Sequence, residues 1–164
     1  MLLQTVRPNI VQAIRAYRVD DLMQAAEAAG QHFLYANLSE SQSKQEVLDK
    51  IAESFLFPAH FGKNLDALFD CMTDLVHRSG AQPGFVVVLE QIPDNPRFDR
   101  EAREQLLDVF RDTADYWAER RIPFRCFYSF AVARSADASA WDRVNEVAPA
   151  AEKPAPKPVP KNGP

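Results

Sequence analysis

The sequence predicts an α/β fold in which a small parallel β-sheet, with three core strands, packs against α-helices. The first observation is residues 85–89, which are apolar without interruption, as a strand covered by helices on both faces must be. The second is the order of the elements. Strands are predicted at 32–38, 85–89 and 124–130, and helical patterns separate them. Neighbouring parallel strands need crossover connections of this kind, so we expect one sheet with helices packed on it.

The helices between the strands have recognisable starts. Ser43 and Glu46 form the capping-box pattern that opens a helix. Asn64 is a good N-cap for a second helix, predicted over residues 65–78. Apolar residues of this second helix keep the helical period and form one stripe: Leu65, Leu68, Phe69, Met72, Leu75 and Val76. A long helix is predicted over residues 99–121, and Pro123 ends its pattern.

The segments at the two ends are assigned separately from the predicted domain, which spans residues 32–130. Residues 1–31 form an N-terminal extension with a weak strand pattern at 13–19 and a helix at 22–29. The sequence leaves open whether this extension joins the sheet or packs on its edge. Residues 131–148 form a C-terminal extension. Residues 149–164 hold six of the twelve prolines and no aromatic residue, so we expect a disordered tail.

Composition and charge narrow the class of protein. Hydrophobic residues make up 46% and charged residues 26% of the chain, which is ordinary for a globular domain. Neither an apolar run of ~18 residues nor a secretory signal is visible, so no membrane association is expected. We expect a cytoplasmic protein in which Cys71 and Cys126 are free thiols. Residues 1–148 carry a formal net charge of −6, because residues 149–164 carry +2 of the total of −4. This acidic balance argues against direct binding of nucleic acid.

The helix that follows Asn64 carries an acidic face. Asp66, Asp70 and Thr73 occur at positions i, i+4 and i+7, which places them together beside the apolar stripe. Like charges one turn apart destabilise a helix by about 0.2–0.5 kcal/mol, and no lysine or arginine is interleaved with these acids. The pattern is typical of a solvated helix face or of a surface for a positively charged partner, and the spacing alone leaves both open.

The segment around this helix also carries a dense motif. Residues 57–71 read Phe-Pro-x-x-Phe-Gly-x-Asn-Leu-Asp-Ala-Leu-x-Asp-Cys, and this run resembles the barstar family of intracellular ribonuclease inhibitors. By the order of the elements, the resemblance covers about residues 32–130. It implies a barstar-like three-stranded parallel sheet. It also implies an inhibitor that plugs the cationic cleft of a ribonuclease with this loop and helix, where carboxylates take the positions of phosphates.

The resemblance implies seven partner-binding residues when it is carried over position by position. Asp70 matches the family's central carboxylate, and Asp66 matches a second acid one turn earlier. The others match two rim residues of the loop, an aromatic residue at the interface edge, a polar contact and a further acid on the long helix: Gly62, His60, Phe69, Thr73 and Asp112. Four positions depart from the family pattern. Lys63 and Tyr116 each replace an acid, His60 replaces a tyrosine, and Leu75 replaces a tryptophan.

These residues predict a monomeric inhibitor that binds a basic ribonuclease or ribonuclease-like toxin and blocks its active site. The departures keep an alternative open, in which the same fold is a non-inhibitory protein-interaction or regulatory module. An enzyme is not expected: His60 lies near Cys71 in sequence, but neighbouring carboxylates would suppress the thiolate. The sequence shows no metal-ligand spacing and no phosphate-binding glycine loop, so neither a metal nor a cofactor is expected.

Overall fold

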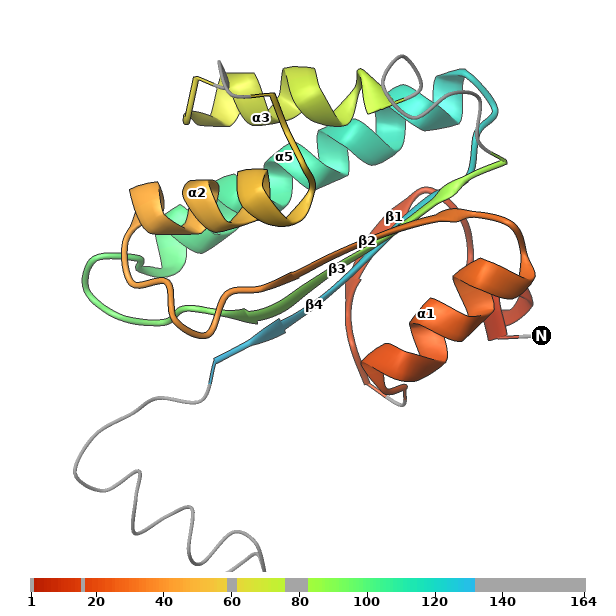
Figure 1. Ribbon diagram of the computed structural model, residues 1–164, viewed down its shortest axis with the longest axis horizontal. Coiled ribbons are helices and arrows are strands. Elements are labelled where there is room, and N and C mark those ends of the chain that lie inside the picture. Colours follow the sequence, from red (N-terminus) through yellow and green to blue (C-terminus); the bar gives the residue numbers. More distant parts are fainter. Residues whose placement is uncertain (1, 16, 59–61, 76–82, 132–164) are drawn as a thin grey trace, which may run out of the picture. The chain divides into compact units, whose positions relative to one another are not determined.

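Four parallel β-strands form the centre of the molecule (Figure 1). The computed structural model describes residues 2–15, 17–58, 62–75 and 83–131. The strands are β1 (Ile10–Ala13), β2 (His32–Asn37), β3 (Phe85–Ile92) and β4 (Phe124–Phe130), and they lie in the order β1-β4-β3-β2. Every neighbouring pair is parallel. The predicted α/β fold and its three core strands are therefore confirmed, with β1 as a fourth strand.

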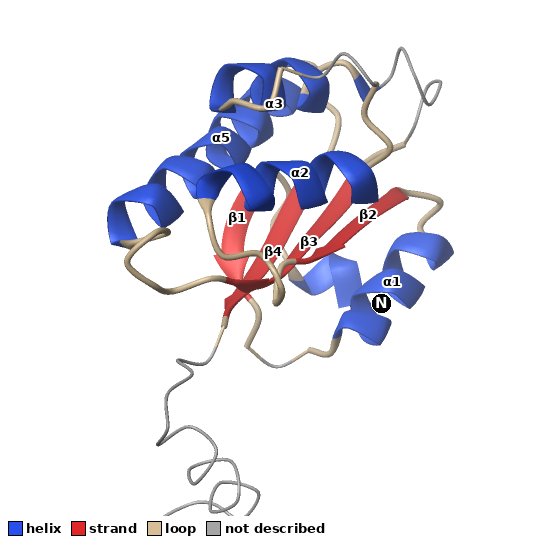
Figure 2. Cartoon of the chain, turned by 60° about the vertical axis from the view of Figure 1, so that its left-hand side comes forward, coloured by secondary structure: helices blue, strands red, loops and turns tan. Residues whose placement is uncertain are grey.

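Helices cover both faces of this sheet (Figure 1, Figure 2). One face carries α2 (Lys44–Ser54), α3 (Leu65–Met72) and α5 (Arg100–Glu119), and the other carries α1 (Val19–Ala28) and the short 3₁₀ helix η1 (Leu2–Thr5). Successive side chains of a strand point to opposite faces. Val87 and Leu89 therefore join the core under α2, α3 and α5, while Val86 and Val88 join the core under α1. This burial on both faces explains why residues 85–89 are apolar without interruption.

The N-terminal extension joins the sheet, but its strand does not lie where the sequence predicted it. Residues 10–13 pair with β4, whereas the weak alternation predicted a strand over residues 13–19. All four residues of β1 are half-buried, so this edge strand shows no alternation of buried and exposed positions. Tertiary contacts fix it instead. The side-chain amide of Asn9 donates to the carbonyls of Ala114 at 3.0 Å and Ile122 at 3.1 Å.

A buried arginine ties η1 to the sheet. Arg125 of β4 is only 7% exposed. Its guanidinium donates to the carbonyl of Val6 at 2.9 and 3.0 Å, and to the carbonyl of Leu3 at 3.3 Å. Burial lowers the pKa of Arg125, because the charged guanidinium has lost contact with water. The two carbonyls replace part of that water, so the chain before β1 is integral to the packing of β4.

Caps define the ends of the predicted helices. The Ser43 hydroxyl accepts from the amide of Glu46 at 3.2 Å, and the Glu46 carboxylate accepts from the amide of Ser43 at 3.3 Å, so the predicted capping box is confirmed. Asp99 caps α5 by accepting from the amide of Ala102 at 3.0 Å. Across the described ranges, no helix is both long enough and apolar enough to cross a membrane.

The two cysteines and the C-terminal segments were also the subject of predictions. Cys71 and Cys126 are not joined in a disulfide. Burial raises the pKa of Cys126, because the charged thiolate would lose its hydration. The predicted tail and all of the C-terminal extension except Ala131 lie outside the described residues.

Candidate protein-binding site

The acidic helix α3 begins with a fixed cap. The Asn64 side-chain oxygen accepts from the amide of Ala67 at 2.7 Å, and its side-chain amide donates to the carbonyl of Gly62 at 3.3 Å. The predicted N-cap is therefore confirmed, and its second hydrogen bond ties the preceding loop to the helix. Because N-cap hydrogen bonds satisfy the free amides of the first turn, the direction in which α3 leaves the loop is well defined.

The end of α3 differs from the prediction. The sequence predicted one helix through residue 78. α3 ends at Met72, Leu75 is helical again after the break, and residues 76–78 lie outside the described residues. Thr73 is the C-cap, and its hydroxyl donates to the carbonyls of Phe69 at 2.9 Å and Asp70 at 3.2 Å. A hydroxyl that bonds back to the last turn competes with continuation of the helix. Leu75, beyond the cap, is buried as the apolar stripe predicted, and Val76 lies outside the described residues.

Two carboxylates on α3 have no partner of their own within the described part of the chain. Asp66 and Asp70 are both exposed. Neither takes part in an ion pair or a side-chain hydrogen bond with any described residue, unlike Asp99, whose carboxylate caps α5. Their spacing of one helical turn matches the prediction from the sequence. A cation from another molecule can therefore pair with them without displacing an existing contact.

Helix α5 packs against α3 and places a third acid, Asp112, beside it. The indole N–H of Trp117 donates to the carbonyl of Met72 at 3.2 Å. The rings of Phe69 and Tyr116 meet edge to face, with centroids 6.3 Å apart. Asp112 is exposed and stands one turn before Tyr116, so it lies on the side of α5 that borders α3.

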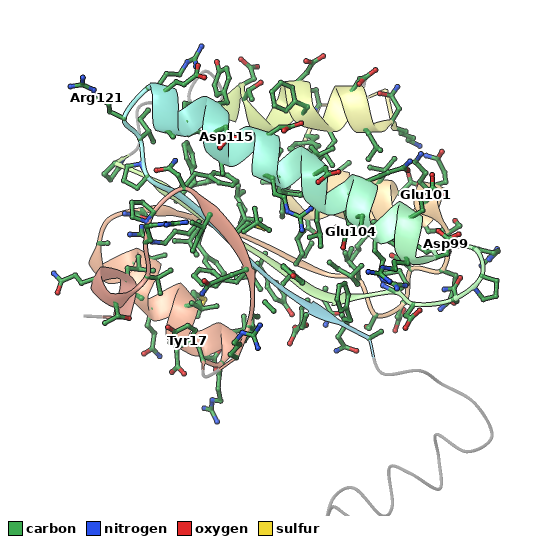
Figure 3. The ribbon with its side chains drawn as sticks, turned by 180° about the vertical axis from the view of Figure 1, so that it is seen from behind. Tyr17, Asp99, Glu101, Glu104, Asp115 and Arg121 are labelled. Carbon is green, nitrogen blue, oxygen red and sulfur yellow. The ribbon has the colours of Figure 1, made fainter. Side chains whose placement is uncertain are left out.

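Two other acids of α5, Glu104 and Asp108, share the helical row of Asp112 and Tyr116, but both pair with Arg111. Figure 3 shows Glu101, Glu104 and Asp115 spread along the helix. Glu104 pairs with Arg111 at 3.2 Å, so its charge is already compensated. We define the acidic face as Asp66, Asp70 and Asp112, the three exposed acids with no ion pair to a described residue that the α3–α5 packing brings together.

Phe69 and Thr73, two of the predicted partner contacts, also have structural roles within the domain. Phe69 is half-buried against Tyr116, so it supports the helix pair and still presents part of its ring. The Thr73 hydroxyl is committed as a donor to the helix carbonyls, which leaves only its oxygen to accept a hydrogen bond from a partner.

The loop before α3 is described in part. His60 lies outside the described residues, so its predicted contact is not tested. Gly62 is exposed, and a methyl group at this position would lie 3.3 Å from both the Ala67 methyl and the Asn64 side-chain nitrogen. That approach is tighter than normal van der Waals contact. A larger residue at position 62 would therefore push against the N-cap of α3.

The sequence did not predict how the cation at Lys63 is compensated. The Lys63 ammonium lies 3.3 Å from the Asp49 carboxylate of α2, and both side chains are about half exposed, at 56% and 45%. An exposed pair of this kind contributes only about 0–1 kcal/mol to stability. Asp49 also offsets part of the positive charge of Lys63, which would oppose a cationic partner. Nothing in the spacing of these residues, which lie on different elements, signals the pair.

A second cation borders the acidic face at the end of α5. The Arg120 guanidinium stacks over the Tyr116 ring, with 3.6 Å between the guanidinium carbon and the ring centroid, and donates to the Tyr116 carbonyl at 3.0 Å. The spacing of four residues on a helix could have signalled this contact. It places a positive charge beside the carboxylates, so the face is acidic with one cationic edge.

Fold and site together define a small α/β protein that presents an acidic helix on a packed scaffold. Residues 31–129 match the family described as Barstar (barnase inhibitor). The match covers more than half of the chain, so this protein belongs to the barstar family. No curated protein matches the sequence. The resemblance carried by residues 57–71 is thereby confirmed at the level of the family.

The described residues show no sign of a metal site. They contain no group of three or more His, Cys, Asp or Glu side chains that could hold a metal ion. Cys71 is half-buried, and the loop histidine that could pair with it lies outside the described ranges. Members of this family are inhibitors rather than enzymes.

Proposed function

We propose that this protein binds a basic ribonuclease or ribonuclease-like toxin, one to one, and blocks its active site with residues 57–63 and α3. The observation that supports the proposal most directly is the pair Asp66 and Asp70, which is exposed and carries no ion pair within the described ranges. The pair lies inside the motif that characterises the family. A phosphate-binding cleft is lined with cations, and carboxylates at phosphate-like positions form charge-assisted hydrogen bonds with them.

Preorganisation is the physical basis of such inhibition. The Asn64 cap and the contact between Trp117 and Met72 hold α3 at both ends, so the carboxylates need little ordering on association. Asp112 on α5 widens the negative surface from one helix to two. Electrostatic attraction of this kind accelerates association and weakens as salt is added. We therefore expect the association rate constant to fall steadily as ionic strength rises.

An inhibition assay tests the proposal. The full chain is titrated against a panel of basic microbial ribonucleases that includes barnase, and cleavage of RNA is measured at each ratio. We expect at least one enzyme to be inhibited at one-to-one stoichiometry. We also expect the double variant Asp66→Asn and Asp70→Asn, which keeps the size of both side chains, to lose that inhibition. Inhibition that persists in the double variant would contradict the proposal.

A non-inhibitory interaction module is the second candidate. The guanidinium of Arg120, held over Tyr116 beside the acidic face, favours it, because a cation there opposes docking into a cleft lined only with cations. Capture of partners from the source cell separates the two candidates. A stable partner that does not cleave RNA and needs Arg120 for binding would favour the module, and a captured ribonuclease would favour the inhibitor.

A further inference from the structure

A hollow of about 410 Å³ opens at the carboxyl end of the sheet, on the face covered by α1. We call it the strand-end hollow. The connection from β1 to α1 and the start of α1 line one side, and residues near the ends of β3 and β4 line the other: Ile14, Tyr17, Arg18, Val19 and Asp20, then Glu90 and Ser129. Tyr17 is labelled beside α1 in Figure 3. The acidic face lies on the opposite side of the sheet, so the hollow is separate from the proposed inhibitory surface.

The position of the hollow in the topology is one at which α/β proteins bind ligands. The connection after β1 runs through α1 on one face of the sheet, whereas the connection after β3 runs through α5 on the other face. Strand β4 lies between these two strands. Ligands of open α/β sheets bind outside the carboxyl ends of the strands. The strand-end hollow lies at this end of the sheet.

The sheet is also irregular at this point. The register between β3 and β4 shifts between Leu89 and Ile92. Gln91 has a φ of 60°, in the left-handed region that non-glycine residues rarely adopt. Its amide donates to the side-chain oxygen of Ser129 at 3.0 Å instead of to a carbonyl of the ladder. Bulges and strained backbone of this kind concentrate at ligand sites, where they redirect side chains.

The side chains of the hollow combine one acidic end with apolar walls. Glu90 is half-buried, accepts a hydrogen bond from the Tyr35 hydroxyl, and takes part in no ion pair with a described residue. Ile14 and Val19 supply aliphatic surface. The ring of Tyr17 is held edge-on against a buried phenylalanine of β4, with centroids 6.3 Å apart. A half-buried carboxylate is stabilised most by a cation that also donates hydrogen bonds.

We propose that the strand-end hollow binds a small aliphatic molecule with a primary ammonium group. The ammonium donates to the Glu90 carboxylate and the Ser129 oxygen, and the aliphatic chain lies against Ile14 and Val19. A simple amine and an amino acid share this chemistry. Arg18 at the mouth distinguishes them, because its guanidinium can pair with the carboxylate of an amino acid and has no such role toward an amine.

Chemical-shift titration of the full, isotopically labelled chain tests the proposal. The probes are pentylamine, norleucine and pentanol, which share an aliphatic chain and differ in their charged groups. We expect saturable shifts of the Gln91, Ser129 and Val19 amides with pentylamine or norleucine, and none with pentanol. Tighter binding of norleucine, weakened by Arg18→Gln, would identify an amino acid as the preferred source. Equal affinity in Arg18→Gln would identify an amine.

Variants provide the decisive comparison. Glu90→Gln keeps an oxygen for the Tyr35 hydroxyl but removes the charge, so the fold is retained and binding should weaken about tenfold or more. Glu27→Gln removes an exposed acid from the far end of α1 and should leave binding unchanged. The proposal is overturned if neither charged probe gives saturable shifts at the hollow, if pentanol binds equally well, or if Glu90→Gln binds as tightly as the natural chain.

Discussion

Removal of residues 2–30 should abolish the cooperative folding of this protein, although the family match begins only at residue 31. These residues supply β1, α1 and η1. Beneath them lie Val86, Val88 and Phe127, each with 0% exposure. Re-exposure of a buried Val or Phe side chain loses about 1.5–3 kcal/mol, so three of them lose about 5–9 kcal/mol. A domain of this size is stable by only about 5–15 kcal/mol.

Urea denaturation of residues 31–164 beside the full chain measures this effect. Fluorescence of Trp117, which is 3% exposed, reports on the core under α2, α3 and α5. We expect no cooperative transition in the shortened chain, together with binding of a hydrophobic dye. A cooperative transition with a free energy of unfolding within about 1 kcal/mol of the full chain would refute the reasoning, since burial under α1 would then contribute almost nothing.

Point variants on α1 test the same idea without truncation. Leu22 has 0% exposure and lies in the core under α1, so Leu22→Ala should lower the free energy of unfolding by about 2–5 kcal/mol. Its neighbour Met23 is 42% exposed, and Met23→Ala should change stability by no more than about 0.5 kcal/mol. Equal effects of the two substitutions would show that α1 does not pack as described.

Three further predictions concern single residues elsewhere in the fold. Arg121 follows α5 with a φ of 60° and takes the same position after its helix that Gly30 takes after α1. Arg121→Gly should therefore raise the free energy of unfolding, measured by urea denaturation, by about 0.5–1 kcal/mol. An unchanged or lower free energy of unfolding would contradict this. Trp117→Phe leaves the Met72 carbonyl without its 3.2 Å donor and should lower the free energy of unfolding by about 1–3 kcal/mol. Calorimetry should show a lower melting temperature, and an unchanged melting temperature would contradict the prediction. Burial, and then the neighbouring carboxylate, raise the pKa of Tyr35 from 10.0 to about 12. The unfolded chain therefore releases this proton first, and stability should fall as pH rises from 10 to 12; Tyr35→Phe should reduce that fall, and an identical pH profile would count against the shift.

The sequence predicted burial and exposure correctly where a whole face of a helix or strand lies either in the core or in solvent. The uninterrupted run of β3 predicted burial on both faces, and Val86 and Val87 indeed enter different cores. The Asn64 cap joins its side-chain oxygen to a backbone amide three residues later, so it could be predicted from the local sequence. The spacing of Asp66 and Asp70 likewise predicted a shared helix face, because helix geometry alone decides it.

Features that depend on distant parts of the chain could not be predicted. The position of β1 is fixed by Asn9, whose partners lie more than 100 residues away. The ion pair between Lys63 and Asp49 joins two separate elements, and the backbone at Lys63 is left-handed, with a φ of 56°. No local pattern specifies either feature. α3 ends at Met72 although the apolar stripe continues to Leu75, and the Thr73 hydroxyl bonds back to the carbonyl of Phe69 at this end.

The affinity of two single variants for an inhibited ribonuclease tests the role of the acidic face most directly. Asp70→Ala removes a carboxylate of α3, and Asp115→Ala removes an exposed carboxylate of α5 outside the acidic face. We predict that Asp70→Ala weakens binding about 30-fold or more, the scale of an interface hot spot, while Asp115→Ala changes it less than about threefold. Equal losses in the two variants, with both proteins folded, would contradict the assignment of binding to α3.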